Sequence, residues 1–124
     1  MDTKNALWAA FYRVDKVWGT EDWIVNNELY CFKVLTISPG FQCSLHKHKV
    51  KDETFVVFSG EVIFEQEACS EILRPGYTRR IAPGTLHRFG SVDGAVIFEI
   101  STHHEDSDSY RVTESGPICT QEKS

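Results

Sequence analysis

Short runs of alternating apolar and polar residues, separated by turn residues, dominate this chain of 124 residues. A period of two is typical of β-strands that bury one face. The runs that predict strands cover residues 14–18, 22–25, 29–37, 42–48, 54–58, 61–66, 78–81, 86–89 and 95–101. Pro-Gly, Asn-Asn and Asp-Gly pairs lie between many of these runs, as expected for turns. Many short strands at this spacing predict an all-β sandwich or barrel.

The two ends of the chain have weaker patterns. Residues 3–12 place Leu7, Trp8 and Phe11 at helix-compatible spacing, although a strand or an irregular arm fits this short segment nearly as well. The segment after Tyr110 is polar, and we expect it to be irregular. We therefore expect one domain over residues 1–124, with a barrel core at about 14–111, an N-terminal arm at 1–13 and a C-terminal tail at 112–124.

Composition narrows the class of partner. The net charge is -5, and no basic stretch favours binding to nucleic acid. No apolar run approaches the roughly 20 residues of a membrane helix, and the first residues lack the order of a signal peptide, so we expect a cytoplasmic protein without a membrane partner. The four cysteines include no Cys-x-x-Cys pair, which disfavours a zinc knuckle or a thioredoxin-type redox centre.

A group of histidines and a carboxylate predicts a metal site. His46 and His48 are one residue apart, so on a strand they point to the same side. Glu53 opens the next predicted strand, and His87 lies in a later hairpin. Together these four side chains would supply three nitrogens and one oxygen to one divalent transition metal, for which Mn, Fe, Co, Ni and Zn are all suitable.

Strand parity predicts the surroundings of this site. If His46 and His48 face the lumen, Gln42 and Ser44 share that face as candidate substrate-binding groups, and Cys43, Leu45 and Lys47 face outward. Glu53 would face inward with Phe55 and Val57, which form an apolar floor.

The opposite face of these strands is also apolar. Leu45, Val56 and Phe58 would expose large side chains if the barrel stood alone. Because exposed apolar patches mark interaction surfaces, we expect a homodimer.

The motif Gly40-x5-His46-x-His48-x4-Glu53-x6-Gly60 resembles the first signature of the cupins at each of its fixed positions. The second cupin signature is matched more loosely by Gly76, the Pro83-Gly84 turn and His87, with Ser91 where an asparagine is usual. The resemblance implies a double-stranded β-helix, also called a jelly-roll barrel, that holds one metal ion.

A narrower resemblance covers most of residues 14–111. The segments 17–21, 23–27, 48–55, 101–106 and 108–111 are similar to those of the short cupin-type sugar isomerases of the D-lyxose isomerase type, and to cupin-type sugar-phosphate isomerases. This resemblance implies an aldose–ketose isomerase that acts on a free or phosphorylated sugar through an enediol. The implied partner is a small polyhydroxylated substrate.

Two further residues are candidates for catalysis. Glu99 is a candidate general base, although an outward position in a subunit contact is as consistent with the sequence. Lys33 interrupts an apolar strand, so its ammonium either contacts substrate in the lumen or reaches solvent.

The same residues fit other functions. With Fe(II), the four ligands suit a cupin dioxygenase, and without turnover they suit a metal- and sugar-binding cupin. The lysines at 47, 49 and 51 predict a solvated face or, less favourably, a contact with a phosphate or carboxylate. The run 103–106 contains further possible metal ligands, and we expect it in a loop near the barrel rim or near a neighbouring subunit.

Overall fold

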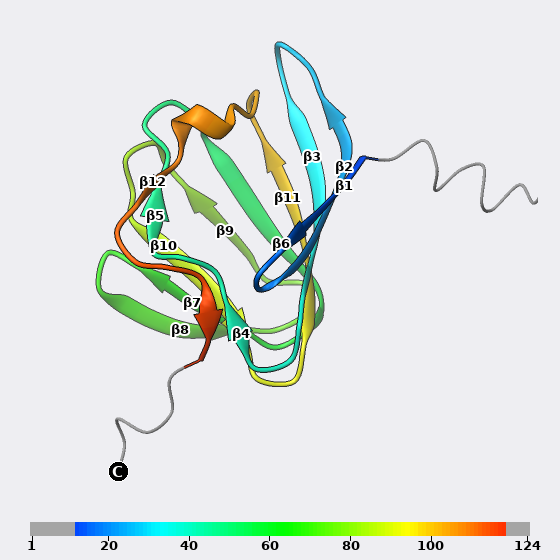
Figure 1. The fold of residues 1–124 in the computed structure, drawn as a ribbon, viewed down its shortest axis with the longest axis vertical. Coiled ribbons are helices and arrows are strands. Elements are labelled where there is room, and N and C mark those ends of the chain that lie inside the picture. Colours follow the sequence, from blue (N-terminus) through cyan, green and yellow to red (C-terminus); the bar gives the residue numbers. More distant parts are fainter. Residues whose placement is uncertain (1–11, 119–124) are drawn as a thin grey trace, which may run out of the picture.

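The structure, a computed structural model, describes residues 12–118 as a barrel of short antiparallel strands (Figure 1). The strands are β1 (Tyr12–Lys16), β2 (Gly19–Asn26), β3 (Cys31–Ile37), β4 (Phe41–Gln42), β5 (His46–Lys47), β6 (Glu53–Gly60), β7 (Val62–Gln66), β8 (Cys69–Leu73), β9 (Thr78–Ile81), β10 (His87–Ser91), β11 (Ala95–Ser101), β12 (Tyr110–Arg111) and β13 (Gly116–Pro117). A single 3₁₀ turn, η1 (Asp106–Asp108), is the only helical element among the described residues.

The strands form two sheets that face each other. One sheet has the order β1-β2-β3-β11-β6-β9, and the other has the order β12-β5-β10-β4-β13. Strand β7 pairs with β10 and with β8, which extends the second sheet. This architecture confirms the all-β double-stranded β-helix. No helix within residues 12–118 is long and apolar enough to cross a membrane.

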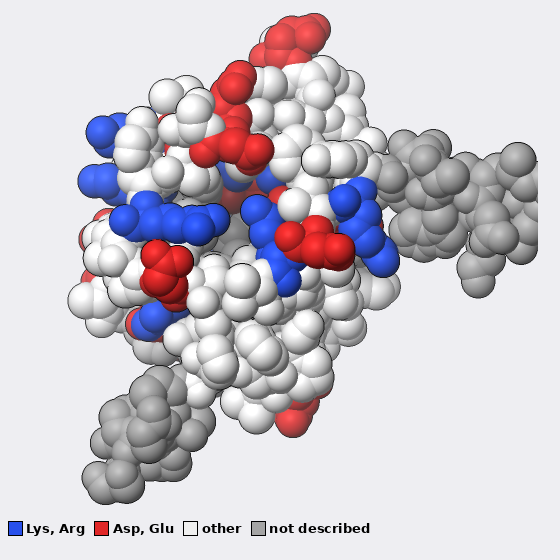
Figure 2. Space-filling model, viewed as in Figure 1, with Lys and Arg blue, Asp and Glu red and all other residues white. Residues whose placement is uncertain are grey.

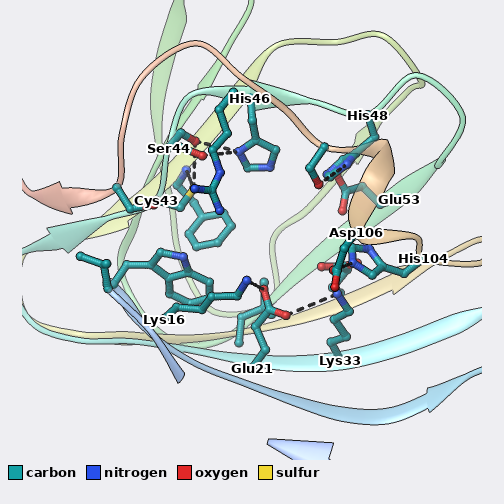
Figure 3. A pocket seen from close by; sticks show the side chains of 18 of the residues that line it. Lys16, Glu21, Lys33, Cys43, Ser44, His46, His48, Glu53, His104 and Asp106 are labelled. Atoms are coloured by element: carbon teal, nitrogen blue, oxygen red, sulfur yellow. Dashed lines mark hydrogen bonds and ion pairs between the residues drawn. The ribbon is translucent and has the colours of Figure 1, made fainter. Parts of the chain in front are cut away.

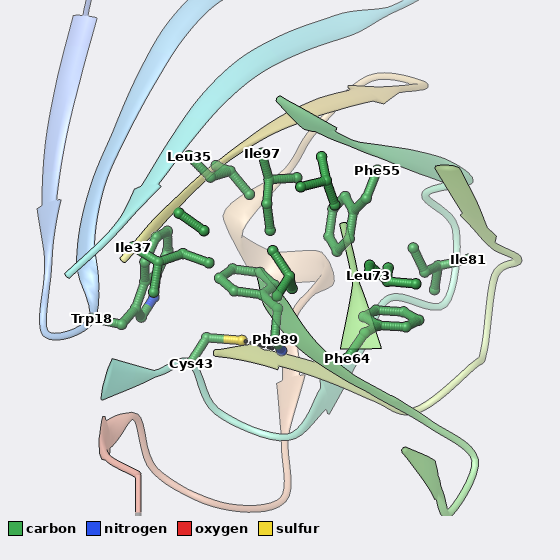
Figure 4. Packing of buried hydrophobic residues seen from close by; sticks show 13 residues of the cluster. Trp18, Leu35, Ile37, Cys43, Phe55, Phe64, Leu73, Ile81, Phe89 and Ile97 are labelled. Carbon is green, nitrogen blue, oxygen red and sulfur yellow. Dashed lines mark hydrogen bonds between the residues drawn. The ribbon is translucent and has the colours of Figure 1, made fainter. Parts of the chain in front are cut away.

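The core lies between the two sheets, and strand alternation explains its composition. In β3, β6 and β11, alternate residues are buried while their neighbours are half-buried or exposed, as a sheet with one covered face requires. Phe55 is buried in this core (Figure 4). Val57 is buried there too, as parity predicts. The buried apolar cluster consists of Trp18, Leu35, Ile37, Cys43, Phe55, Val57, Val62, Phe64, Leu73, Ile81, Phe89, Ala95 and Ile97.

Strand β8 was not predicted from the sequence. Residues Cys69–Leu73 form β8, which pairs with β7 at the edge of the second sheet and buries only Leu73. Because four of its five residues are exposed, no apolar alternation marks it. The turn before β8 consists of Glu67 and Ala68, which both have positive φ angles. Glycine or asparagine usually occupies such positions, so the sequence of this turn did not indicate a hairpin.

The ends of the barrel extend beyond the predicted boundaries. Tyr12 and Arg13 belong to β1, which pairs with β2, and the rest of the predicted helix at 3–12 lies outside the described residues. The tail was expected to be irregular, which is wrong for β13, because Gly116 and Pro117 pair with Gln42 and Phe41 of β4. The pairing partner is distant in sequence, so the local pattern carried no signal for it.

Candidate metal centre

A cavity of about 470 Å³ opens between the two sheets at one end of the barrel. Figure 2 views this face, where acidic and basic side chains are interspersed around a hollow. Figure 3 shows that His46 and His48 approach the cavity from one side and that Glu21 and Lys33 approach it from the other. The cavity is the place where polar residues of both sheets meet.

Three histidines gather at this cavity. His46 lies on β5 and pairs directly with His87 of β10, while His48 follows β5 in the next turn. The ring centroids of His46 and His87 are 4.4 Å apart, and those of His46 and His48 are 5.0 Å apart. One nitrogen from each ring lies within 4.8 Å of the others. The paired strands thus bring together residues that are about forty positions apart in sequence.

Hydrogen bonds define which nitrogen of each ring faces the cavity. The Nδ1 atoms of His46, His48 and His87 lie 2.8, 2.9 and 2.9 Å from the carbonyl oxygens of Ser44, Asp108 and Thr85, respectively. Because a carbonyl oxygen only accepts, each Nδ1 donates its hydrogen. In the neutral rings each Nε2 therefore presents a lone pair, which is the arrangement that metal-binding histidines usually have.

Glu53, the first residue of β6, completes the cluster. Its Oε2 atom lies 3.1 Å from Nε2 of His87 and 3.4 Å from Nε2 of His48. Both Glu53 Oε2 and His87 Nε2 are buried without a hydrogen-bond partner among the described residues. Two acceptors that face each other this closely repel unless a proton or a metal cation lies between them. The residues present therefore fit a divalent metal ion.

The environment favours the neutral form of His46 and His48 and the charged form of Glu53. Burial lowers the pKa of His46 to about 3, with a further contribution from His87. Burial also lowers the pKa of His48. Burial alone would raise the pKa of Glu53, but His87 and the ammonium of Lys51 lower it, and the net shift is downward. These are the protonation states that metal ligands require.

A buried ion-pair cluster lies next to Glu53. The Nζ atom of Lys51 is 2.8 Å from Glu99 Oε2, 3.0 Å from His104 Nδ1 and 3.4 Å from Glu53 Oε1. Burial alone would lower the pKa of Lys51, but Glu99 and Glu53 raise it, and the net shift is upward. Lys51 is therefore an ammonium that links the candidate ligand Glu53 to the candidate base Glu99.

Glu99 and Lys33 both line the cavity. They pair across β11 and β3, and both side chains are buried. The Nζ atom of Lys33 lies 3.4 Å from Glu21 Oε1 and 4.1 Å from the centre of the Trp23 ring. The inward alternatives for both residues are thus the ones that the fold adopts, and the alternatives of a subunit contact for Glu99 and of solvent for Lys33 are wrong.

Parity was wrong at the start of the histidine segment. Ser44 is buried and lines the cavity, but Gln42 does not line it, and Cys43 points into the core instead of outward. Strand β4 ends at Gln42 and β5 begins at His46, so the intervening residues break the alternation. The Cys43 backbone N–H donates to the carbonyl of Phe89, whose own N–H contacts the Cys43 sulfur, which holds the irregular stretch against β10.

Several residues that line the cavity were not among the predicted site residues. Lys51 was assigned with Lys47 and Lys49 to a solvated face, but its side chain is buried. His104 and Asp106, from the predicted rim loop, also line the cavity, with His104 Nε2 2.8 Å from Asp106 Oδ1. The only signal for Lys51 was its position two residues before Glu53 in the metal-binding motif.

Comparison with known proteins places this arrangement in a family. The cupin domain model matches residues 33–101, which include all four candidate ligands. A D-lyxose/D-mannose isomerase of Thermosediminibacter oceani is 33% identical over 110 residues, and the alignment covers 66% of this chain and 61% of that protein. A D-lyxose ketol-isomerase of Thermofilum sp. is 32% identical with the same coverage.

A solved structure shares the fold at low sequence identity. The RmlC-like cupin of Shewanella frigidimarina has a TM-score of 0.73 and 13% identity, over 80% of this chain and 89% of that one. The chain spans about three-fifths of the length of the curated relatives it matches. Because the family model covers more than half of the chain and includes the histidine cluster, this protein belongs to the cupin domain family.

Proposed function

We propose that this protein is a metal-dependent isomerase that interconverts an aldose and a ketose. The carrying observation is the cluster of three Nε2 lone pairs and one buried carboxylate oxygen at a cavity that also holds a separate carboxylate, Glu99. The names of the two curated relatives, a D-lyxose/D-mannose isomerase and a D-lyxose ketol-isomerase, support the same substrate class.

The proposed metal ligands are His46, His48, Glu53 and His87. Any of Mn, Fe, Co, Ni or Zn suits three imidazoles and one carboxylate. A divalent metal held there would polarise the carbonyl of an open-chain sugar and so acidify the neighbouring C–H group.

Glu99 is the proposed general base. Its Oε2 atom accepts a hydrogen bond from Lys51, and Ser101 Oγ lies 3.4 Å away, whereas no hydrogen bond from residues 12–118 holds Oε1. In the proposed reaction Glu99 takes the proton from the carbon beside the carbonyl. The hydroxyl proton on that carbon passes to the former carbonyl oxygen, and Glu99, whose proton can exchange with solvent, returns a proton to the former carbonyl carbon. The reaction therefore needs no external oxidant.

Lys33 and Ser44 are the proposed contacts for substrate oxygens. Both line the cavity, and the buried ammonium of Lys33 already contacts Glu21. A sugar hydroxyl at this wall would replace water as the further partner of the ammonium. Ser44 Oγ lies 3.2 Å from Nδ1 of His46, so a sugar hydroxyl bound to Ser44 would lie beside this candidate metal ligand.

The charges of the cavity favour an unphosphorylated sugar. The three lysines that line it are each paired with a carboxylate that also lines it: Lys16 and Lys33 with Glu21, and Lys51 with Glu99. Acidic residues at the cavity outnumber basic ones, since Asp15, Glu21, Glu53, Glu99, Asp106 and Glu114 face Lys16, Lys33, Lys51 and Arg111. A divalent ion at the histidine cluster would only balance this excess, so a dianionic phosphate would meet no net positive charge there.

The experiment is proton NMR in deuterated water. Protein loaded with Mn(II), passed through a desalting column to remove free ion, is incubated without oxygen with D-lyxose, D-mannose and their ketoses. We expect deuterium to appear at the carbon beside the carbonyl, because an enediol exchanges with solvent even at equilibrium. Glu99→Gln should lower the exchange rate by about 10²- to 10⁴-fold, as expected for loss of a general base, and should retain metal.

Other outcomes would contradict the proposal. If no neutral or phosphorylated sugar that is tested exchanges its proton for deuterium, the proposed isomerase activity is refuted. Oxygen uptake by the Fe(II)-loaded protein would favour a dioxygenase, and sugar binding without turnover would favour a binding protein. A His46→Ala variant that keeps the full metal content would refute the ligand assignment.

A further inference from the structure

The turn that carries His48 and Lys51 is held by a residue from a distant part of the chain. The carboxylate of Asp108, in η1, accepts hydrogen bonds from three consecutive backbone N–H groups of this turn. Asp108 Oδ1 is 2.9 Å from the nitrogen of Lys49, and Asp108 Oδ2 is 3.0 Å from the nitrogen of Lys51. The nitrogen of Val50 lies 3.2 Å from both oxygens.

This contact is strong because the acceptor is ionised. Hydrogen bonds from backbone N–H groups to a carboxylate are roughly twice as strong as those between neutral groups. The turn lies beyond the end of β5 at Lys47, and apart from the contacts of Asp108 its backbone is held by the Gly84 N–H, which donates to the carbonyl oxygen of His48 over 2.6 Å. The carboxylate of Asp108 therefore takes the role that a neighbouring strand has for His46 and His87.

Asp108 also determines which nitrogen of His48 faces the cavity. The Nδ1 atom of His48 donates to the carbonyl oxygen of Asp108 over 2.9 Å. The corresponding acceptors for His46 and His87 are Ser44 and Thr85, each two residues earlier on the same segment. His48 is thus the one histidine of the three whose orientation depends on a remote segment.

We propose that Asp108 is a positioning residue of the metal centre, which acts by holding the 48–51 turn so that His48 Nε2 points at the ion. The inference rests on the metal site of the proposed function but not on isomerisation. Outer partners of metal-bound histidines typically contribute 10- to 100-fold to metal affinity. The carboxylate of Asp108 contributes here through the turn, and its carbonyl contributes through the ring.

The test measures metal affinity instead of turnover. The dissociation constant of Mn(II) is determined from the electron paramagnetic resonance signal of the free ion for the wild type, Asp108→Ala and Asp108→Asn. We expect Asp108→Ala to weaken Mn(II) binding by about 10- to 100-fold. Asp108→Asn, which keeps one acceptor oxygen, should weaken it by less. The visible spectrum of the Co(II)-loaded Asp108→Ala protein should shift toward that of His48→Ala, because both variants lose the same ligand.

The matched control is Glu105→Gln. Glu105 lies three residues earlier in the same segment, and its side chain contacts His103. Within residues 12–118, its carboxylate makes no hydrogen bond to the backbone of the 48–51 turn, unlike that of Asp108. The Mn(II) dissociation constant of the Glu105→Gln variant should lie within about twofold of the wild-type value, as expected for an exposed side chain that is remote from the ligands. If Asp108→Ala does not fold without metal, as judged by circular dichroism, Asp108→Asn decides the question by the same measurement.

A double variant separates positioning from general stability. In a His48→Ala background, Asp108→Ala should change Mn(II) affinity by less than about twofold, because it acts through the ligand already removed. The proposal would be overturned if Asp108→Ala weakened Mn(II) binding in the His48→Ala background by the same factor as in the wild type. Wild-type affinity together with a wild-type Co(II) spectrum in folded Asp108 variants would also overturn it. Failure of the isomerase proposal would appear separately, as absent deuterium exchange in a protein that binds metal normally.

Discussion

Lys51 illustrates how much one side chain depends on its surroundings. In the sequence Lys51 is the last of three alternating lysines. Unlike the other two, it has an ammonium that is enclosed by two carboxylates and an imidazole nitrogen. Backbone parity does not explain the difference, because the turn ends the strand. The cluster forms because β11 places Glu99 and β6 places Glu53 at the same end of the barrel. The ion pairs in turn satisfy two buried carboxylates that would otherwise be costly.

We predict that Lys51→Met destabilises the protein by about 3–5 kcal/mol, because it leaves Glu53 and Glu99 buried without their counter-ion. The measurement is urea unfolding of the metal-free protein at neutral pH. The control is Lys49→Met, whose ammonium lies on the surface over the Tyr110 ring and should cost no more than about 1 kcal/mol. Equal midpoints for the wild type and Lys51→Met would show that the buried cluster contributes nothing to stability.

At the scale of the elements, the turn between β6 and β7 carries a strict requirement. Gly60 has a φ of 77° and pairs with Ala95 of β11. A Cβ atom at this position would overlap the carbonyl oxygen of Gly94 and contact Ala95. Strand β6 also bulges just before this turn, because Val57 pairs with Ile97 and Ser59 pairs with Val96, which leaves Phe58 without an opposite residue. This glycine therefore lets two sheet connections pass close to each other.

We predict that Gly60→Ala lowers the free energy of unfolding by more than about 2 kcal/mol, because it combines a left-handed backbone with a backbone clash. Gly116→Ala is the matched control, since a Cβ atom there meets nothing and its φ is not positive. It should change stability by less than about 0.5 kcal/mol. Thermal and urea unfolding of both variants checks this, and a Gly60→Ala protein as stable as Gly116→Ala would refute the steric argument.

At the scale of the whole molecule, the outer face of the six-stranded sheet carries exposed apolar side chains. Phe58 and Ile100 are 61% and 50% exposed. The Phe58 and Phe98 rings stack at 4.9 Å, and Phe32 packs edge-on against Phe98. These side chains lie on β3, β6 and β11, on the opposite side of the sheet from the cavity. The expected apolar outer face is therefore present on β6, whereas Cys43 belongs to the core instead.

The homodimer stays a prediction, and the structure indicates where to test it. Light scattering at micromolar concentration should give twice the 14.1 kDa of one chain. Phe58→Glu should give a single chain's mass, because a buried charge at an apolar interface is costly. Val92→Glu, at an equally exposed apolar residue in the turn before β11, should remain dimeric. A monomeric wild type would contradict the prediction.

The sequence predicted those features of the fold and the site that depend on residues close together in the chain. Alternation marked the inner faces of β3, β6 and β11, because a period of two is a local consequence of backbone geometry. The spacing of His46 and His48 and the position of Glu53 predicted which residues form the ligand cluster, although His48 lies in the turn after β5 and Glu53 belongs to the opposite sheet. Edge strand β8 and the β4–β13 pair left no trace, because one buries almost nothing and the other depends on a distant partner.

What the sequence alone determined is therefore the set of strands with a buried face and the residue types that gather at one end of the barrel. Only the tertiary structure decided that Glu99 and Lys33 point inward, that Lys51 is buried between carboxylates, and that Asp108 holds the turn of His48. The physical reason is that parity repeats along one strand, whereas strand pairing, breaks such as that between Gln42 and His46, and hydrogen bonds across 60 residues depend on the closed barrel.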